Sequence, residues 1–160
     1  MLKGFKPVYL LLIVLMIFSL NACKNKPKKI EQKVTVYNQE TFVSAASDGE
    51  NKIADWLSHK EIIINGLDKH GSSALTVASK NGRLETVKIL VDKGADVNVT
   101  DNDGDTPLMC AAFAGNLGTV KFLLSKGANP TIKSNNGWTA YIYASEKGYT
   151  EVAELLKPKK

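Results

Sequence analysis

The sequence predicts an all-α solenoid, a stack of short helical hairpins, because one pattern of residues recurs with a period of 33. Several residue types keep this period at once, which a random sequence rarely does. In such a fold each unit buries its apolar face only against its neighbours. The periodic positions are Gly71, Gly104 and Gly137; Gly49, Gly82, Gly115 and Gly148; Gly94 and Gly127; and Ala45, Ala78, Ala111 and Ala144.

The unit from Asp101 to Lys133 shows how one copy is expected to fold. The pair Thr106–Pro107 predicts a helix start, because threonine caps free backbone N–H groups and proline suits the first helical position. Gly115 is expected to end this helix, and a second, apolar helix is expected from about Leu117 to Ser125. Residues 129–133 then return in an extended conformation to the next glycine-containing turn.

The same register divides residues 38–160, the predicted folded domain, into four copies. The central copies, 68–100 and 101–133, are the most regular. The first copy, 38–67, is degenerate because Glu61 replaces the loop glycine. The last copy, 134–157, stops after Leu155–Leu156. Terminal units of a solenoid face water on one side, so both outer copies are interpreted as caps.

These copies resemble ankyrin repeats. The segment Gly104–Leu108 is similar to the family's G-x-T-P-L motif, with Met109 in place of its usual histidine. Ala111–Ala112 and Gly115 match the two alanines and the glycine of the family's first helix, and Lys126–Asn129 matches its G-A-D/N loop. The resemblance implies four helix-turn-helix repeats with β-turn tips. It also implies binding through the tips and the exposed face of the first helices.

The N-terminus predicts an export signal. Lys3 and Lys6 precede a continuous apolar run from Val8 to Leu20, which is shorter than the roughly 20 residues of a membrane span. Leu20–Cys23 resembles the bacterial lipobox, so residues 1–22 are interpreted as a lipoprotein signal peptide and Cys23 as the lipid attachment residue. Several acyl chains, such as palmitate, would anchor it firmly. The alternatives are secretion with an unmodified cysteine and an uncleaved signal anchor.

Residues 23–37 are expected to form a flexible, lysine-rich linker between this anchor and the repeats. The protein is therefore predicted to be lipid-anchored to a bacterial cell membrane, facing the periplasm or the exterior. Lys24 is not the aspartate that commonly retains such lipoproteins in an inner membrane, so the outer membrane is favoured if there are two.

The charge of the chain argues against a nucleic-acid partner. The formal net charge is +5, but residues 1–36 contain seven lysines and one glutamate. Residues 37–160 hold fourteen basic and fifteen acidic residues, so the repeats offer no basic groove for phosphates.

No catalytic, metal or cofactor motif is apparent, and an enzyme is not predicted. His59 and His70 have no partners at metal-ligand spacing. The acidic run Asp101–Asp105 lacks the glycine position and the bidentate glutamate of a calcium loop. Cys110 is expected to be a small hydrophobe of the core.

The remaining functional hypothesis is a surface that binds a partner protein. Exposed aromatic residues are favoured binding anchors, and Phe113 and Trp138 occupy positions where the repeat requires no apolar side chain. The protein is predicted to be a monomer and to need no cofactor. The predicted partner-binding residues are Phe113, Trp138, Asp103, Asp105, His70, Asn102, Asn136, Lys80 and Lys147.

Two other function classes stay open at this point. The alternative is a periplasmic regulator, such as an immunity or protective factor, which would change the activity of an envelope enzyme. A metal-dependent or small-molecule enzyme would need a cluster of polar residues in a pocket.

Overall fold

The computed structural model describes residues 39–49, 53–59 and 62–158. The predicted signal peptide, the lipid attachment residue and the linker lie outside these residues. The described part is made of helices, turns and loops, with no β-strand and one isolated bridge between Leu67 and Ser73. No helix in this part has the length and apolar character needed to cross a membrane. The helices are α2 (Gln39–Asp48), α3 (Ile53–Trp56), α4 (Ala74–Lys80), α5 (Leu84–Asp92), α6 (Pro107–Phe113), α7 (Leu117–Ser125), α8 (Ala140–Glu146) and α9 (Thr150–Leu156).

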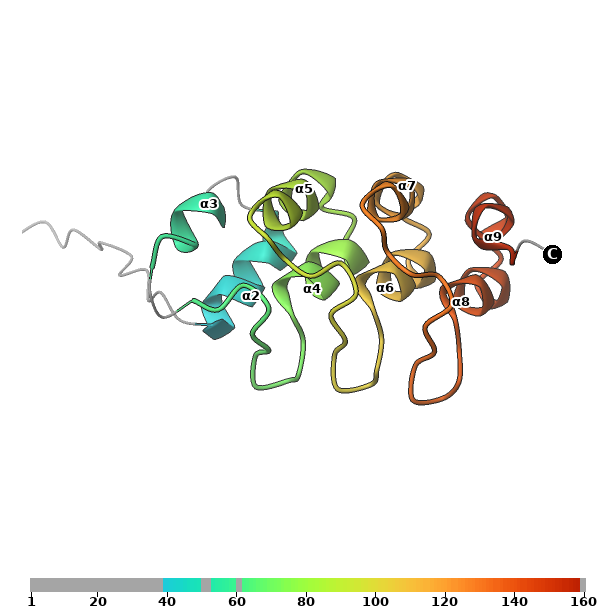
Figure 1. Ribbon diagram of the computed structural model, residues 1–160, viewed down its shortest axis with the longest axis horizontal. Coiled ribbons are helices and arrows are strands. Elements are labelled where there is room, and N and C mark those ends of the chain that lie inside the picture. Colours follow the sequence, from blue (N-terminus) through green and yellow to red (C-terminus); the bar gives the residue numbers. More distant parts are fainter. Residues whose placement is uncertain (1–38, 50–52, 60–61, 159–160) are drawn as a thin grey trace, which may run out of the picture. The chain divides into compact units, whose positions relative to one another are not determined.

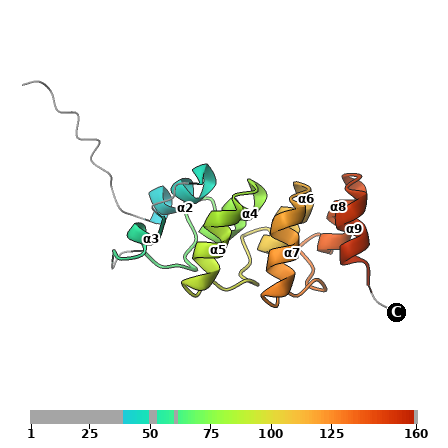
Figure 2. The same cartoon turned by 90° about the horizontal axis from the view of Figure 1, so that it is seen from above.

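These helices form four successive pairs (Figure 1). The inner helices α2, α4, α6 and α8 pack on one another in sequence, and the outer helices α3, α5, α7 and α9 form a second row. Figure 2 shows the pairs following one another along the stack. The loops that precede α4, α6 and α8 project from the same side as three parallel tips. The predicted all-α repeat fold is confirmed.

The predicted helix starts are also present. Thr106 precedes α6, its side chain accepts a hydrogen bond from the backbone N–H of Met109 at 3.3 Å, and Pro107 is the first helical residue. Ser73 and Thr139 cap α4 and α8 in the same way. A serine or threonine hydroxyl therefore satisfies a free backbone donor at the start of each of these three inner helices.

The predicted end of the first helix in this unit is confirmed, and the return segment differs from its prediction. Gly115 follows α6 with a φ of +72°, which only glycine adopts without strain, and α7 spans Leu117–Ser125 as expected. Residues 129–133 are not simply extended, because they contain a turn at Pro130–Thr131. The Asn129 side chain favours this turn by accepting the Thr131 N–H at 2.9 Å.

The core consists of equivalent residues stacked from repeat to repeat. Leu90, Leu123 and Leu156, spaced by 33, are at most 5% exposed on the outer helices. The periodic alanines of the inner helices are also buried, and their small side chains let α4, α6 and α8 approach closely. Hydrophobic burial is thus shared among the repeats, as expected for a solenoid.

Asparagine side chains connect neighbouring repeats. The side-chain oxygen of Asn65 accepts the backbone N–H of Asp96 at 2.9 Å, and that of Asn98 accepts the N–H of Asn129 at 2.8 Å. Asn116 donates to the carbonyl oxygens of Ser79 and Lys80 at 2.8 and 2.9 Å, where α4 ends. These bonds satisfy polar backbone groups between the repeats and fix how adjacent pairs align.

The N-terminal copy is the most modified, as its degenerate sequence predicts. Its inner helix α2 has ten residues, whereas α3 has only four. Phe42 and Trp56 nevertheless bury their rings in the common core. Gln39 bonds across the copy, donating to the Gly66 carbonyl at 2.8 Å and accepting the Ile63 N–H at 3.1 Å.

Candidate functional site

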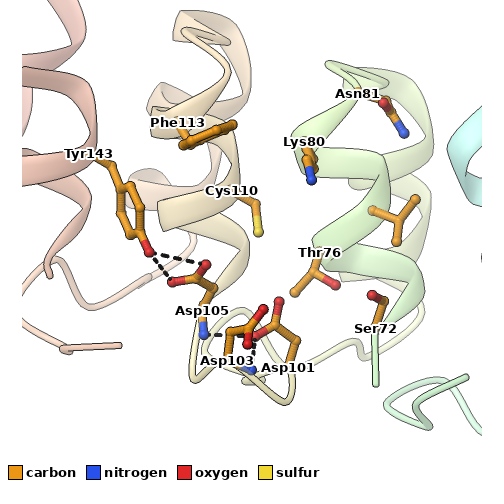
Figure 3. A pocket seen from close by; sticks show the side chains of 11 residues that line it. Ser72, Thr76, Lys80, Asn81, Asp101, Asp103, Asp105, Cys110, Phe113 and Tyr143 are labelled. Carbon is orange, nitrogen blue, oxygen red and sulfur yellow. Dashed lines mark hydrogen bonds between the residues drawn. The ribbon is translucent and has the colours of Figure 1, made fainter. Parts of the chain in front are cut away.

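A groove of about 460 Å³ opens between α4 and α6 and extends to Tyr143 on α8 (Figure 3). Equivalent repeat positions build its wall: Val77, Cys110 and Tyr143 are spaced by 33, and so are Lys80 and Phe113. The groove therefore lies on the inner helices, the face on which partner binding was predicted. We call it the inner groove.

Phe113 is the exposed aromatic residue of the inner groove. Phe113 is 37% exposed, and its ring packs edge-on against the Tyr143 ring at a centroid distance of 5.9 Å. The ammonium groups of Lys147 and Lys80 lie 4.3 and 5.9 Å from the ring centroid, within the range of cation–π attraction. This end of the groove is therefore aromatic and flanked by positive charge.

The other end of the inner groove is acidic and is formed by the tip that precedes α6. Asp101 supports the tip itself, because its side-chain oxygen accepts the backbone N–H groups of Asp103 and Asp105 at 3.0 and 2.8 Å. The Asp105 carboxylate accepts the Tyr143 hydroxyl at 2.9 and 3.3 Å, as Figure 3 shows. Asp103 is exposed, and within the described residues no side-chain hydrogen bond or ion pair engages its carboxylate.

Burial raises the pKa of Asp105, since the charged carboxylate loses solvation in the groove wall. The hydrogen bond from Tyr143 and the positive charge of Lys80 oppose this shift, and the negative charges of Asp101 and Asp103 add to it. Burial is also the main cause of the raised pKa of Tyr143, so its hydroxyl stays protonated and donates at neutral pH. The three aspartates thus form a site of concentrated negative charge.

Cys110 lies in the groove wall and not in the fully buried core, contrary to the sequence prediction. It is half-buried, and its position on α6 is the one that Val77 and Tyr143 occupy on the neighbouring helices. Burial still raises its pKa to about 12, which keeps the thiol protonated. The residue therefore contributes an apolar surface to the groove and no reactive thiolate.

The inner groove brings together only some of the predicted binding residues. Lys80, Phe113, Asp103 and Asp105 line it, and Lys147 reaches the Phe113 ring. The other four predicted residues lie outside its lining.

Trp138 is half-buried behind the groove. Its ring packs against Tyr143 at a centroid distance of 5.1 Å, so it supports a residue of the wall. His70 is exposed on the first tip. Asn102 connects two neighbouring tips, because its backbone N–H donates to the Gly71 carbonyl at 3.2 Å. Asn136 accepts a long bond of 3.5 Å from the Ser134 hydroxyl within the last tip.

Tyr143 is a residue of the groove wall that the sequence did not predict. Its register was readable, because it lies 33 residues after Cys110 and 66 after Val77. What the sequence did not show is that its hydroxyl reaches back to Asp105 in the preceding repeat.

Among the described residues, no group of three or more His, Cys, Asp or Glu side chains is arranged to hold a metal ion.

Comparison with known families agrees with this architecture. The family model described as "Ankyrin repeats (3 copies)" matches residues 11–101 and 93–160. No curated protein matches the chain. Ankyrin repeats indicate a protein–protein interaction module, and the matched family is not a catalytic one. The chain belongs to the ankyrin-repeat family.

Proposed function

We propose that this protein is a membrane-tethered interaction module of a bacterial cell envelope, which holds a partner protein in its inner groove. The observation that carries the proposal is the exposed ring of Phe113 in that groove. The equivalent positions on α4 and α8 are Lys80 and Glu146, so the fold does not require an aromatic side chain there. An exposed aromatic residue beside polar groups is the usual anchor of a protein interface.

The tether is proposed from the N-terminal sequence. Lipid on Cys23 would hold the chain at a membrane, with the outer membrane favoured if the cell has two. The linker up to Val36 would let the repeats stand up to about 45 Å from the lipid when extended. Such a spacer leaves the tips and the inner helices accessible to another envelope protein.

Site-specific photo-crosslinking in membranes of the source organism tests the binding surface. A photoreactive residue at position 113 is expected to capture one defined protein. The matched control is position 121, because Lys121 is exposed on the outer helix α7. Equal capture of the same protein from both positions, or capture of none from position 113, would contradict the proposed groove.

The lipid anchor is tested separately with Cys23→Ser. The variant is expected to leave the membrane fraction and to lose the mass of the acyl chains, because serine at this position carries no lipid. Cell fractionation and mass spectrometry of the N-terminal peptide measure both effects. A Cys23→Ser protein that stays fully membrane-bound would rule out lipid on this residue as the anchor.

A further inference from the structure

The inner groove has two chemically different ends, and this polarity says what kind of segment fits it. At the tip end are the carboxylates of Asp103 and Asp105. At the helix end are Phe113 and Lys80, which Figure 3 shows. The ammonium group of Lys147 lies over the Phe113 ring at the same end. Between the two ends the wall is apolar or weakly polar. A ligand that fills the groove must therefore match negative charge at one end and an aromatic surface at the other.

Among the described residues no ion pair engages the carboxylates of the tip. The charge of Lys80 in the same groove still favours the charged form of Asp105 by lowering its pKa, although burial outweighs this effect. The described ion pairs lie elsewhere: Lys69 pairs with Glu40, Lys88 with Glu85, Lys121 with Glu151, Lys126 with Asp92, and Lys157 with Glu154. The Lys80 ammonium group lies 5.9 Å from the centroid of the Phe113 ring, and one positive charge faces the three carboxylates of the tip. The tip thus keeps a net negative charge that a cation from outside can neutralise.

The three tip aspartates are not equally available to such a cation. Asp101 accepts two backbone N–H groups on its Oδ1 oxygen, which ties its carboxylate to the tip scaffold. Asp105 uses the Tyr143 hydroxyl as a donor but retains further acceptor capacity on its two oxygens. Asp103 is exposed and has no side-chain partner in the described part of the chain. An incoming donor would therefore meet Asp103 first and could bridge to Asp105.

The apolar wall favours a particular neighbour for that cation. Val77 and Cys110 are half-buried beside the acidic end, and Phe113 exposes its ring further along the same groove. Lys80 and Lys147 already flank that ring. A further cation from the ligand is repelled there, and an uncharged apolar side chain is favoured. The groove volume of about 460 Å³ suits a short stretch of chain and not a whole folded domain.

We propose that the inner groove binds an extended segment of the partner protein that places an arginine or lysine at Asp103 and Asp105 and an aliphatic or aromatic side chain on Phe113. Arginine suits the site better than lysine, because its planar guanidinium has several donors for two carboxylates and is less strongly hydrated. This inference rests on the proposed function, since it names the chemistry of the partner in the same groove.

A displayed library of random short peptides, selected on the purified full chain in mild detergent, tests the inference. Enriched peptides are expected to carry an arginine or lysine within a few residues of a large apolar residue. A representative enriched peptide should bind about tenfold or more weakly to Asp103→Asn/Asp105→Asn, because charge-assisted hydrogen bonds are lost. Asparagine keeps an acceptor for Tyr143, and Asp103→Asn alone, at an exposed position, checks the result without disturbing the wall.

The matched control variant is Glu85→Gln/Asp92→Asn. It makes the same change in net charge, but on exposed residues of the outer helix α5. Its affinity for the peptide should stay within about twofold of the original chain, since screening leaves little effect from distant exposed charges. An equal loss of affinity in the control would reduce the effect to net charge and overturn the inference.

The same variants separate this inference from the proposed function when they are tested on the protein captured from position 113. If Phe113→Ala and the aspartate variant both weaken that complex, the inference is supported. If Phe113→Ala weakens it and the aspartate variant does not, the groove binds a partner but the cationic segment is wrong. If neither variant weakens it, the proposed function itself fails. Enrichment of acidic peptides, or no enrichment of basic residues over the starting library, also overturns the inference.

Discussion

At the scale of single residues, the inner groove depends on one hydrogen bond between repeats. The Tyr143 hydroxyl on α8 donates to the Asp105 carboxylate at the tip before α6, and the Trp138 ring packs behind Tyr143. These contacts hold the aromatic wall and the acidic tip in a fixed relation. The Asp105 carboxylate is consequently drawn into the wall, and its partial burial raises its pKa.

This raised pKa predicts how Asp105 changes stability with pH. Above the ordinary carboxyl pKa of 3.8, the unfolded chain releases its proton first, and the folded protein keeps it until the pH passes the raised value. The folded state binds more protons in that interval, so the Asp105 contribution to the free energy of unfolding falls as the pH rises through it. Asp105→Asn should remove this fall while keeping an acceptor for Tyr143.

Urea unfolding of both proteins between about pH 3 and about pH 7 measures the difference. The Asp105→Asn protein is expected to gain stability relative to the original chain as the pH rises. Parallel profiles over the whole range would show that the Asp105 carboxyl has the same affinity for protons in both states.

At the scale of elements, the tips are held in register by close contact between a glycine and the next repeat. Gly104 has a φ of +75°, and a Cβ atom placed on it would lie 2.7 Å from the Asn135 side-chain oxygen and 3.0 Å from the Asn135 backbone nitrogen. Asn135 needs this place, because its side chain donates to the Asn102 carbonyl at 3.0 Å. Gly137, at the equivalent position in the last repeat, has a φ of +80° and no such neighbour.

Gly104→Ala should therefore destabilise the protein more than Gly137→Ala does. Both variants suffer the strain of a side chain in the left-handed region, which costs about 1–2 kcal/mol. Gly104→Ala also displaces Asn135 and weakens its bond to the neighbouring tip, for about 1 kcal/mol more. Chemical denaturation of the two variants measures the difference directly. Equal losses of stability would mean that contact between tips contributes nothing.

The sequence predicts the ends of helices where the interactions that set them lie within a few residues. The start of α6 at Thr106–Pro107 and both ends of α7 were predictable, because caps and glycine turns act within a few residues. The turn at Pro130–Thr131 was missed, although the Asn129 side chain that favours it was visible in the sequence.

The groove was less predictable than the helices, because its contacts join different repeats. Phe113 and Asp103 were found by their repeat positions, which the period of 33 supplies. Cys110 was expected in the core, since a single repeat does not show that its position borders a groove. The half-burial of Trp138 and the bond from Tyr143 to Asp105 depend on the angle at which α6 and α8 stack. No local sequence pattern specifies that angle.

At the scale of the whole molecule, the repeats form one continuous stack in which the groove belongs to no single unit. Its lining comes from α4, α6 and α8 and from the tips that precede α4 and α6. Each repeat is stabilised mainly by its neighbours, through equivalent core residues and asparagine bridges such as that of Asn116. The inner groove therefore exists only while these three inner helices remain packed together.

This arrangement also explains why a stack of repeats is suited to binding. Its inner helices present a row of equivalent positions, and a change at one position alters the surface without changing the packing behind it. Phe113 between Lys80 and Glu146 is such a change, since these three residues share one repeat position. It places an exposed aromatic side chain where the neighbouring repeats carry charged residues.

The central claim, that the inner groove holds the partner, is tested most directly by the affinity of Phe113→Ala for the protein captured from position 113. The matched control is Leu155→Ala, because Leu155 is 43% exposed on α9, an outer helix. Removal of a central aromatic anchor typically costs an interface about 2 kcal/mol or more, so Phe113→Ala should weaken binding at least about thirtyfold. Leu155→Ala should leave it nearly unchanged. If both variants bind as tightly as the original chain, or if Leu155→Ala causes the larger loss, the partner docks elsewhere and the account is wrong.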